Sequence, residues 1–295
     1  MPQTAHPGTD GAIVVVNYGS SALLARHLTP FPAAGGPRVV VVDNFSTADE
    51  RAAITALARR HGWELVAQPN VGFGAGMNAG VARALELGST AVLLLNPDVQ
   101  IEPDVAADLL AQVADDEHLM VAPAVRHGDG RPAFSRGTLD LRTGALRTSG
   151  ALDPRLEPWL TGACLALSAD LWRRTGGFSD AYFMYWEDLE LSVRATRSGA
   201  RLVVRDDLVV VHDAGGTQGA GKSSLYRYYN CRNRLLFARR NLPRRAALRW
   251  LAGAPRYAWD VGTRGGRGNA LRHPAATLWP ALRGSLAGTW TVLAR

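Results

Sequence analysis

The chain has 295 residues and a hydrophobic fraction of 47%, which is enough to build a folded core and excludes a disordered chain. Its two cysteines, Cys164 and Cys231, lie far apart without metal-ligand spacing, so we expect a reduced, cytoplasmic protein. The first ten residues lack an apolar signal segment, and no run approaches the ~18 apolar residues that span a bilayer.

The net charge of +7 is unevenly distributed. Residues 222–295 contain Lys222 and 14 arginines against one acid, Asp260, a balance of +14, so residues 1–221 carry −7. We therefore expect a body, residues 1–221, and a basic tail, residues 222–295, with different surfaces or partners. Arginine and aromatic residues alternate in the tail at 227–229, 232–240 and 249–251, which is typical of a peripheral site on an anionic membrane. A helical cap with a solvated arginine face is the alternative.

The first hundred residues alternate apolar strands with helices. Unbroken apolar runs suit strands that are buried on both faces of a parallel sheet. Thr47-Ala48-Asp49-Glu50 is a capping box that opens a helix ending near Gly62. A glycine-rich turn at 70–76 opens a second helix, which continues through Leu87. The expected strands are 12–16, 39–42, 64–67 and 91–95. This order predicts a βαβαβ half with polar residues at successive strand ends, where open α/β sheets bind ligands.

Beyond residue 100 the pattern is less regular. Residues 126–158 are rich in arginine, glycine and proline and predict an irregular loop or flap. Apolar strands are expected at 161–168 and 208–212. After Gly221 the sequence predicts arginine-, tryptophan- and tyrosine-rich helices, broken at four prolines.

Polar side chains follow several of the expected strands. Asn96-Pro97-Asp98 comes directly after a strand, where a carboxylate can hold a hard divalent cation that also binds a diphosphate; a capped proline turn is the alternative. Asp43 and Asn44 end the second strand, where a carboxylate can accept from a nucleobase or a ribose. His212 ends a strand and gains a role as a second metal ligand only if it closes on Asp98.

A nicotinamide-dependent enzyme is disfavoured, because Asn17-Tyr18-Gly19-Ser20-Ser21 follows the first strand where a G-x-G-x-x-G fingerprint is required. The glycine cluster at 72–76 comes after the third strand instead. It is either a helix-entry turn that needs positive φ angles or a backbone brought close to a sugar or phosphate, with Asn78 nearby.

The tract 176–188 runs through glycines and aromatic residues and stops on Glu187 and Asp188, which open an amphipathic helix. A carboxylate at the end of an aromatic wall suits a general base in a partly dry cleft. The alternative is that these residues and Glu190 are ordinary first-turn acids that complement the helix dipole.

In their order along the chain these tracts resemble the family 2 glycosyltransferases with a GT-A fold. The likeness is greatest to the rhamnosyltransferase-like branch of bacterial cell-wall and polysaccharide biosynthesis, and it covers roughly residues 11–216. The matching tracts are 15–18, 42–47, 70–74, 95–99, 161–164, 176–178, 182–188 and 211–212.

The resemblance implies an α/β fold: a GT-A type, nucleotide-binding, Rossmann-like mixed sheet flanked by helices, with a basic C-terminal helical extension. The catalytic domain would be 1–221, with a nucleotide-sugar half at about 11–100 and an acceptor and base half at about 101–221. The tail would be 222–295.

The resemblance also implies roles for single residues. Asp188 would be the catalytic base, Asp98 and His212 would hold a divalent cation (Mg²⁺ or Mn²⁺), and Asp43 would read the nucleobase. The other nucleotide-binding residues would be Asn17, Tyr18, Asn44, Gly72, Asn78 and Asn96. The acceptor or sugar pocket would be lined by Trp159, Gly162, Ala163, Trp186 and Glu187. Three positions depart from the family pattern, since Asn96 replaces the first acid of D-x-D, Phe45 replaces a small residue, and Asp213 follows His212.

We therefore expect a metal-dependent, inverting transfer of a sugar to a hydroxyl of an acceptor that is either a saccharide or a saccharide carried on a polyprenyl diphosphate. L-rhamnose or another deoxyhexose from a dTDP-sugar is the expected donor, and a UDP-sugar is the alternative. The expected location is cytoplasmic and peripheral on the inner face of the plasma membrane, with no nucleic-acid partner.

Two other classes compete with the transferase. A nucleic-acid-binding protein would use the basic tail but leaves the carboxylates of the body without a role. A sugar nucleotidyltransferase requires a basic, glycine-rich phosphate loop near the first strand, which this sequence lacks.

Overall fold

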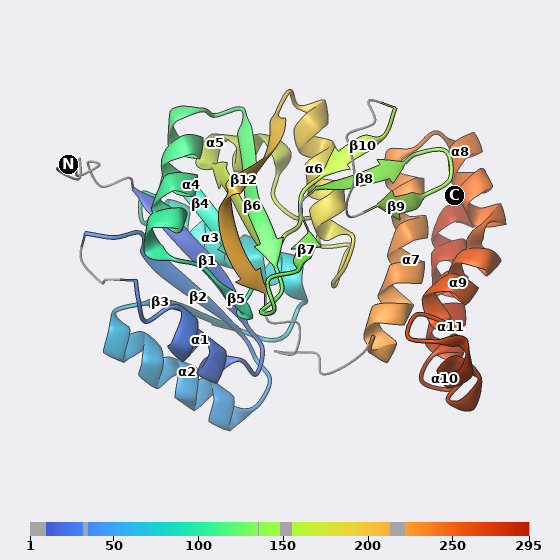
Figure 1. The fold of residues 1–295 in the computed structure, drawn as a ribbon, viewed down its shortest axis with the longest axis horizontal. Helices are drawn as coiled ribbons and strands as arrows, with labels where there is room; N and C mark the ends of the chain where they lie inside the picture. The colour runs from blue at the N-terminus through green and yellow to red at the C-terminus, as the bar shows by residue number, and fades with distance from the viewer. Residues whose placement is uncertain (1–9, 32–34, 135, 148–154, 213–221, 295) are drawn as a thin grey trace.

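The structure is a computed structural model that describes residues 10–31, 35–134, 136–147, 155–212 and 222–294. A large mixed sheet forms the centre of the molecule, with helices on both faces and a helical tail against one end (Figure 1). The strands of this sheet are β1 (Gly11–Asn17), β2 (Arg38–Asn44), β3 (Glu64–Gln68), β4 (Ala91–Leu95), β5 (Val99–Gln100), β6 (Leu119–Arg126), β7 (Pro132–Phe134), β11 (Cys164–Ser168) and β12 (Arg201–His212). Their order is β3-β2-β1-β4-β11-β6-β12-β5, with β7 paired to β6.

The strands β1 to β4 are parallel, so their carboxyl ends meet at one edge of the sheet. Asn17 at the end of β1 lies opposite Asp43 at the end of β2. Strand β11 runs antiparallel beside β4, with Cys164 opposite Leu95. The residues that precede β11 therefore lie beside those that follow β4, at the same edge.

The helices of the body are α1 (Ser21–His27), α2 (Ala48–His61), α3 (Phe73–Glu86), α4 (Pro103–Asp115), α5 (Ala169–Thr175) and α6 (Glu187–Arg197). The predicted start and end of α2 are confirmed, because the Thr47 side chain accepts from the Glu50 amide at 3.2 Å and Gly62 ends the helix in the left-handed region. The Glu50 carboxylate accepts from the amide and hydroxyl of Ser21, so only the Thr47 half of the capping box is formed. Alternate residues of β1 and β2 belong to two separate clusters, one under α1, α2 and α4 and the other under α3. Burial on both faces explains the unbroken valine runs.

The expectation of an irregular loop at 126–158 is wrong in part. Besides β7, it contains β8 (Gly137–Asp140), β9 (Ala145–Arg147) and β10 (Glu157–Trp159), which form a second sheet in the order β10-β8-β9. These strands are three or four residues long and contain arginine, glycine and proline, so no alternating pattern marks them in the sequence. Residue 135 and residues 148–154 of the expected flap lie outside the described residues.

The tail consists of α7 (Ser224–Asn241), α8 (Arg244–Ala252), α9 (Ala254–Gly262), α10 (Arg267–Arg272) and α11 (Leu278–Leu293). Helix α7 lies between the body and the other tail helices (Figure 1). A hydrophobic cluster joins α6 and β8 to α7, α8, α9 and α11. Within the described residues, no helix combines the length and apolar character required to span a membrane.

The expected outward-facing arginine and aromatic segments of the tail are wrong in part. Arg227, Arg234 and Trp250 are buried, with exposed fractions of 5%, 3% and 1%. The Arg234 guanidinium lies over the rings of Trp250 and Tyr257 and donates to the backbone carbonyls of Trp250 and Thr143 at 3.1 and 2.7 Å. Carbonyls and aromatic rings satisfy this buried cation, so it is part of the tail's core.

Candidate active site

Three exposed apolar side chains follow three neighbouring parallel strands. Tyr18 follows β1, Phe45 follows β2 and Val71 follows β3, and their exposed fractions are 55%, 41% and 47%. Large apolar side chains gathered at the carboxyl edge of such a sheet suit a flat aromatic ligand. They therefore mark a candidate nucleobase platform, of which the sequence had indicated Tyr18.

Asp43 lies buried beneath this platform. Its carboxylate accepts from Asn17 Nδ2 at 3.3 Å and from Arg51 Nε at 2.5 Å. Arg51 also donates to the Gln68 carbonyl at 2.8 Å and lies 4.7 Å from the centre of the Phe45 ring. Asp43 has no exposed surface, whereas the Arg51 side chain is 36% exposed. Arg51 is thus the accessible member of the pair, and sequence reasoning missed it; the available signal was a basic residue in the acidic first turn of α2.

Asn17 and Asn44 hold the loops around Asp43 in place. Asn17 Oδ1 accepts from the Ser20 amide at 3.0 Å. Asn44 Nδ2 donates to the Gly72 carbonyl at 2.8 Å, and Asn44 Oδ1 accepts from Gln68 Nε2 at 2.6 Å. Both asparagines are buried, so their side chains orient the loops instead of facing an open site.

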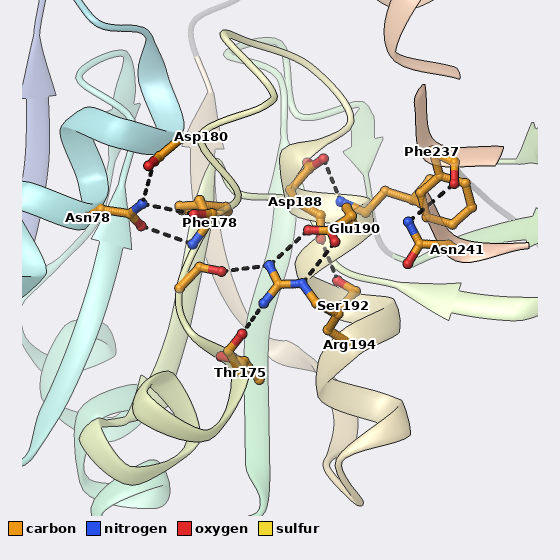
Figure 2. Close-up of polar contacts among 12 residues, drawn as sticks. Asn78, Thr175, Phe178, Asp180, Asp188, Glu190, Ser192, Arg194, Phe237 and Asn241 are labelled. Carbon is orange, nitrogen blue, oxygen red and sulfur yellow. Dashed lines mark hydrogen bonds and ion pairs between the residues drawn. The ribbon is translucent and has the colours of Figure 1, made fainter. Parts of the chain in front are cut away.

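Asn78 connects α3 to residues 178–180, which precede the aromatic tract, residues 182–186 (Figure 2). Its Nδ2 donates to the Phe178 carbonyl at 2.8 Å and to Asp180 Oδ1 at 3.2 Å, and its Oδ1 accepts from the Phe178 amide at 2.9 Å. Both ends of the side-chain amide are therefore used within the protein.

The glycine-rich turn packs directly on the aromatic tract. Gly72 has a φ of 97°, and a Cβ there would lie 2.9 Å from Phe183 Cα and closer still to the Phe183 carbonyl oxygen. That oxygen accepts from the Phe73 amide at 2.8 Å. Gly72 thus fits the interpretation as a helix-entry turn with a positive φ, and its close backbone approach is to Phe183; an approach to a sugar or phosphate stays a prediction.

The turn after β4 brings Asp98 and His212 together. Asp98 Oδ1 lies 3.2 Å from His212 Nε2, which is the condition that the sequence set for a joint role. The geometry is not that of a hydrogen bond, and the buried oxygens Asn96 Oδ1 and Asp98 Oδ1 have no hydrogen-bond partner among the described residues. His27, which sequence reasoning passed over, supports the turn with Nδ1 3.0 Å from the Pro97 carbonyl oxygen.

The donor set of this turn fits a divalent cation. Unpartnered buried polar atoms are rare in folded proteins and need an explanation, and a bound ion is one. A carboxylate, an amide oxygen and an imidazole are ligands that Mn²⁺ accepts, and Mg²⁺ usually takes one or two carboxylates plus substrate phosphates. The described residues contain no cluster of three or more His, Cys, Asp or Glu side chains. The protein would thus supply a few of the ligands of such an ion.

Asp188 is held at the N-terminus of α6 by two backbone amides. Gly162 donates to Asp188 Oδ2 at 3.1 Å, and Leu189 donates to Oδ1 at 2.8 Å. Removal from water raises the pKa of Asp188, and these hydrogen bonds oppose the rise. Burial and the neighbouring Asp188 charge raise the pKa of Glu187 well above its ordinary value, and buried Glu187 Oε2 lacks a hydrogen-bond partner in the described part of the chain. The pair therefore favours a protonated Glu187 beside an ionised Asp188.

Residues 162 and 163 connect the turn after β4 to Asp188. The Asn96 amide donates to the Ala163 carbonyl at 2.8 Å, and Gly162 contacts Asp188. A Cβ on Gly162 would lie 3.3 Å from Asp188 Cβ, so a larger residue would crowd the carboxylate. One short segment thus places the Asp98 turn and Asp188 at the same edge of the sheet.

Glu190, the third acid of this helix, has a structural role. Arg194 donates to both Glu190 oxygens at 2.9 and 2.8 Å, to the Gly177 carbonyl at 2.6 Å and to the Thr175 carbonyl (Figure 2). This buried pair fixes the end of α5 against α6.

The backbone just before Glu187 is in a rare conformation. Tyr185 and Trp186 have φ angles of 65° and 75°, the two positive values among described residues other than glycine. Asn233 of α7, which is fully buried, donates from Nδ2 to the carbonyls of Met184 and Tyr185, both at 2.8 Å. Non-glycine residues in this region persist only where the surroundings hold them, and they gather at functional sites. No motif in the sequence indicates this contact between the tail and the turn before Glu187.

The two tryptophans of the expected acceptor pocket are packed into the protein. Trp186 is 4% exposed and contacts the rings of Phe237 and Trp250 at centroid distances of 5.7 and 6.2 Å. Trp159 is half-buried and lies 5.0 Å from the Phe134 ring. A cavity of about 330 Å³ instead opens between the glycine turn and α7. It is lined by Val71, Asp180, Ala181, Phe183, Tyr228, Tyr229 and Arg232.

The chain is similar in sequence to two glycosyltransferases of other organisms. The chain is 26% identical over 234 residues to the low-salt glycan biosynthesis hexosyltransferase Agl10 of Haloferax volcanii, covering 77% of this chain and 75% of the relative. It is 28% identical over 271 residues to an N-acetylglucosaminyl-diphospho-decaprenol L-rhamnosyltransferase of Mycobacterium tuberculosis, covering 81% and 87%.

The fold is similar to that of the mannosyltransferase PcManGT from Pyrobaculum calidifontis in complex with GDP-Man and Mn²⁺, with a TM-score of 0.55 and 18% identity over 96% of this chain and 85% of that one. The sheet and its flanking helices have the GT-A architecture that the resemblance implied. Residues 13–170, more than half of the chain, match the family described as Glycosyl transferase family 2. The chain therefore belongs to glycosyl transferase family 2.

Proposed function

We propose that this glycosyltransferase moves a sugar from a nucleoside diphosphate to a hydroxyl of a saccharide acceptor, with inversion at the anomeric carbon. The observation that carries the proposal is the pair of hydrogen bonds from Asn96 to Ala163 and from Gly162 to Asp188. They fix a candidate diphosphate site and a candidate base at one edge of the sheet, beside the nucleobase platform.

The relatives support the choice of substrates. The mycobacterial relative is an L-rhamnosyltransferase named for a decaprenol-linked acceptor. We therefore propose L-rhamnose or another deoxyhexose from a dTDP-sugar as the donor, and a polyprenyl diphosphate-linked saccharide as the acceptor. A UDP-sugar is the alternative donor, because the same platform would hold either pyrimidine.

In the proposed reaction the Asp188 carboxylate takes the proton of the acceptor hydroxyl while that oxygen bonds to the anomeric carbon. The bond from this carbon to the phosphate oxygen breaks, and its electron pair leaves on the nucleoside diphosphate. A base with a raised pKa is a stronger proton acceptor. The two amides on Asp188 orient its oxygens, and Glu187, protonated, adds no competing charge.

Asn96, Asp98 and His212 would hold a divalent cation, Mg²⁺ or Mn²⁺. When bound, it would supply positive charge to the departing diphosphate. The mannosyltransferase of the same fold was solved with Mn²⁺, which is consistent with such a cation.

Two substitutions separate the roles of the carboxylates. Asp188→Asn is expected to lower turnover by about 10²–10⁴-fold, the usual contribution of a general base, with donor binding unchanged. Asp98→Ala is expected to weaken donor binding in the presence of Mn²⁺ and to remove its metal dependence. Exposed Asp108→Asn on α4 is the matched control.

The measurements are calorimetric titrations with dTDP-rhamnose, UDP-N-acetylglucosamine and UDP-galactose, with and without Mn²⁺ or Mg²⁺, and product formation on a lipid-linked N-acetylglucosamine acceptor. Near-normal turnover of Asp188→Asn would rule out Asp188 as the base. Equal donor affinity with and without metal, in both the wild type and Asp98→Ala, would rule out the cation site.

A further inference from the structure

Helix α11 has an arrangement of side chains opposite to that of a water-facing helix. Its exposed positions are large and apolar: Trp279, Leu282, Leu286, Trp290 and Leu293, which are 46–75% exposed. Its buried positions are mostly small: Pro280, Ala281, Gly284, Ser285, Gly288 and Val292. At 3.6 residues per turn the two sets fall on opposite faces. A helix of a globular protein normally buries its large apolar residues.

The small face lets α11 pack closely on α7. A Cβ on Gly284 would lie 2.9 Å from the Tyr228 carbonyl carbon, and one on Gly288 would lie 2.9 Å from Leu235 Cβ. Gly284 and Gly288 form a G-x-x-x-G spacing, which is used where apolar helices pack backbone to backbone with their large side chains toward lipid. The outward direction of the tryptophans and leucines is therefore enforced by the packing of α11 on α7.

A groove beside this face extends the apolar surface. It measures about 590 Å³ and lies between α9 and α11. It is lined by Leu251, Ala254, Pro255, Ala258, Trp259, Pro274, Ala275, Leu278, Trp279, Leu282, Ser285, Leu286 and Thr289. Trp259 is 43% exposed at its edge, so α9 contributes an aromatic residue to the same surface. We call the exposed α11 positions and this groove the α11 face.

Two exposed cations lie beside the α11 face, and neither forms an ion pair with a described acid. Arg256 on α9 and Arg283 on α11 are exposed. Of the ion pairs formed by described residues, none involves the tail segment 222–294. The tail as a whole carries +14. A second copy of the chain would set one basic tail against another, and that repulsion disfavours a dimer through this face.

We infer that the α11 face binds the surface of a phospholipid bilayer that contains anionic lipids. Tryptophan prefers the membrane interface, leucine enters the acyl boundary, and each nearby arginine adds attraction to anionic headgroups. This places the membrane contact on α9 and α11 instead of on the segments 227–229, 232–240 and 249–251 that the sequence had suggested, of which only Leu251 lines the groove. The inference deepens the proposed function, since a polyprenyl-linked acceptor resides in the same bilayer, but vesicle binding itself requires no catalysis.

The test is co-sedimentation of the full chain with phosphatidylglycerol-rich vesicles at low salt, beside pure phosphatidylcholine vesicles. The wild type is expected to bind the anionic vesicles more strongly and to release them as salt is raised. The double variant Leu286→Gln/Trp290→Gln is expected to lower the partition coefficient by about tenfold or more, because two exposed side chains no longer enter the bilayer. Leu248→Gln, at an exposed leucine of α8 outside the face, is the control and is expected to bind as the wild type does.

A second pair of variants tests the electrostatic part. Arg256→Gln/Arg283→Gln is expected to weaken binding to anionic vesicles about tenfold, since each arginine near the surface adds a similar attraction to anionic headgroups. Binding to neutral vesicles is expected to change little. Arg173→Gln, on the exposed surface of α5, is the control. All substituted side chains are exposed, so the thermal midpoint of unfolding should be unchanged.

Failure of the wild type to bind anionic vesicles, or binding of the Leu286/Trp290 variant equal to wild type, would overturn the inference. So would a wild-type dimer, seen by analytical ultracentrifugation, that this variant dissociates, because the face would then be a contact between two copies. Donor binding is measured on the same samples. Lost donor binding with intact vesicle binding would count against the proposed function alone, and the reverse against the membrane face alone.

Discussion

Asn233 offers a direct test of whether the tail positions the catalytic turn. Its side-chain amide is fully buried and donates to the carbonyls of Met184 and Tyr185, each at 2.8 Å, while Tyr185 and Trp186 hold left-handed φ angles. Asn233→Ala removes both hydrogen bonds. Two bonds of this kind contribute about 2–4 kcal/mol together when their partners are left unsatisfied.

The strain that these bonds oppose is of similar size. A left-handed non-glycine residue costs about 1–2 kcal/mol, so two cost about 2–4 kcal/mol. Without the Asn233 hydrogen bonds, nothing offsets the backbone strain of Tyr185 and Trp186, so the turn is expected to relax. Glu187 and Asp188, which follow directly, are then expected to shift. A displacement of about 1 Å in a catalytic group can cost about 10²-fold in rate. We therefore expect kcat to fall by about 10–100-fold in Asn233→Ala, with donor affinity nearly unchanged.

The assay compares kcat, KM and the thermal midpoint of unfolding for Asn233→Ala and for Asn241→Ala. Asn241 lies on the same helix, and its Nδ2 donates to the Phe237 carbonyl at 3.2 Å, away from the turn (Figure 2). Asn233→Asp adds a second probe, because an isosteric carboxylate cannot donate to the two carbonyls. The positioning role would be refuted if Asn233→Ala lost stability while kcat and its pH dependence stayed at wild-type values.

Three further predictions concern the Glu187–Asp188 pair and the glycine-rich turn. Because Asp188 must be ionised and its pKa is raised, turnover should increase with pH through a value above that of an ordinary aspartate, and a limb at the ordinary value would contradict this. Glu187 binds its proton more tightly in the folded state than in the unfolded state. Its contribution to stability is therefore fully present below its unfolded pKa and is lost as pH rises through its raised, folded-state pKa. Thermal melts at several pH values should show a smaller loss of stability with rising pH in Glu187→Gln than in the wild type. Gly72→Ala should destabilise more than Gly88→Ala, since both have φ near 90° but only the first would meet Phe183; equal losses would contradict the packing argument.

Burial on both faces made the first strands of the large sheet predictable from the sequence. The runs at 12–16 and 39–42 predicted β1 and β2 closely, because β-branched residues buried on both sides leave no polar interruption. Strand β12 was predicted only at 208–212, because its first part has just three apolar residues, the half-buried run 202–204, between Arg201 and the charged residues 205–207. The short strands between 132 and 159 were missed because each has three or four residues and no alternating pattern.

Residue type and spacing predicted part of the candidate site. Asp98 and His212 do lie together, as their strand-end positions allowed. Arg51 and Asn233 were missed, because each acts through a contact with a distant segment that no local pattern encodes. Asn78 was predicted to bind the nucleotide because it lies beside a glycine-rich turn. In the fold its side-chain amide instead forms hydrogen bonds with the Phe178 backbone, a contact that the local sequence does not indicate.

The number of arginines in the tail does not by itself give the charge of its outer surface, because some of them are buried. Buried Arg234 stacks between Trp250 and Tyr257, and removal from water lowers its pKa, so this cation contributes to packing rather than to an outer surface. Exposed Arg256 and Arg283 instead flank apolar side chains. Helix α7 contacts the turn before Glu187 through Asn233, and α11, which packs on α7, presents the α11 face. A membrane that binds the α11 face therefore contacts the helix pair whose other member, α7, holds the turn before Asp188. We expect substitutions in the α11 face to lower turnover of a lipid-linked acceptor in vesicles more than turnover of a short soluble acceptor.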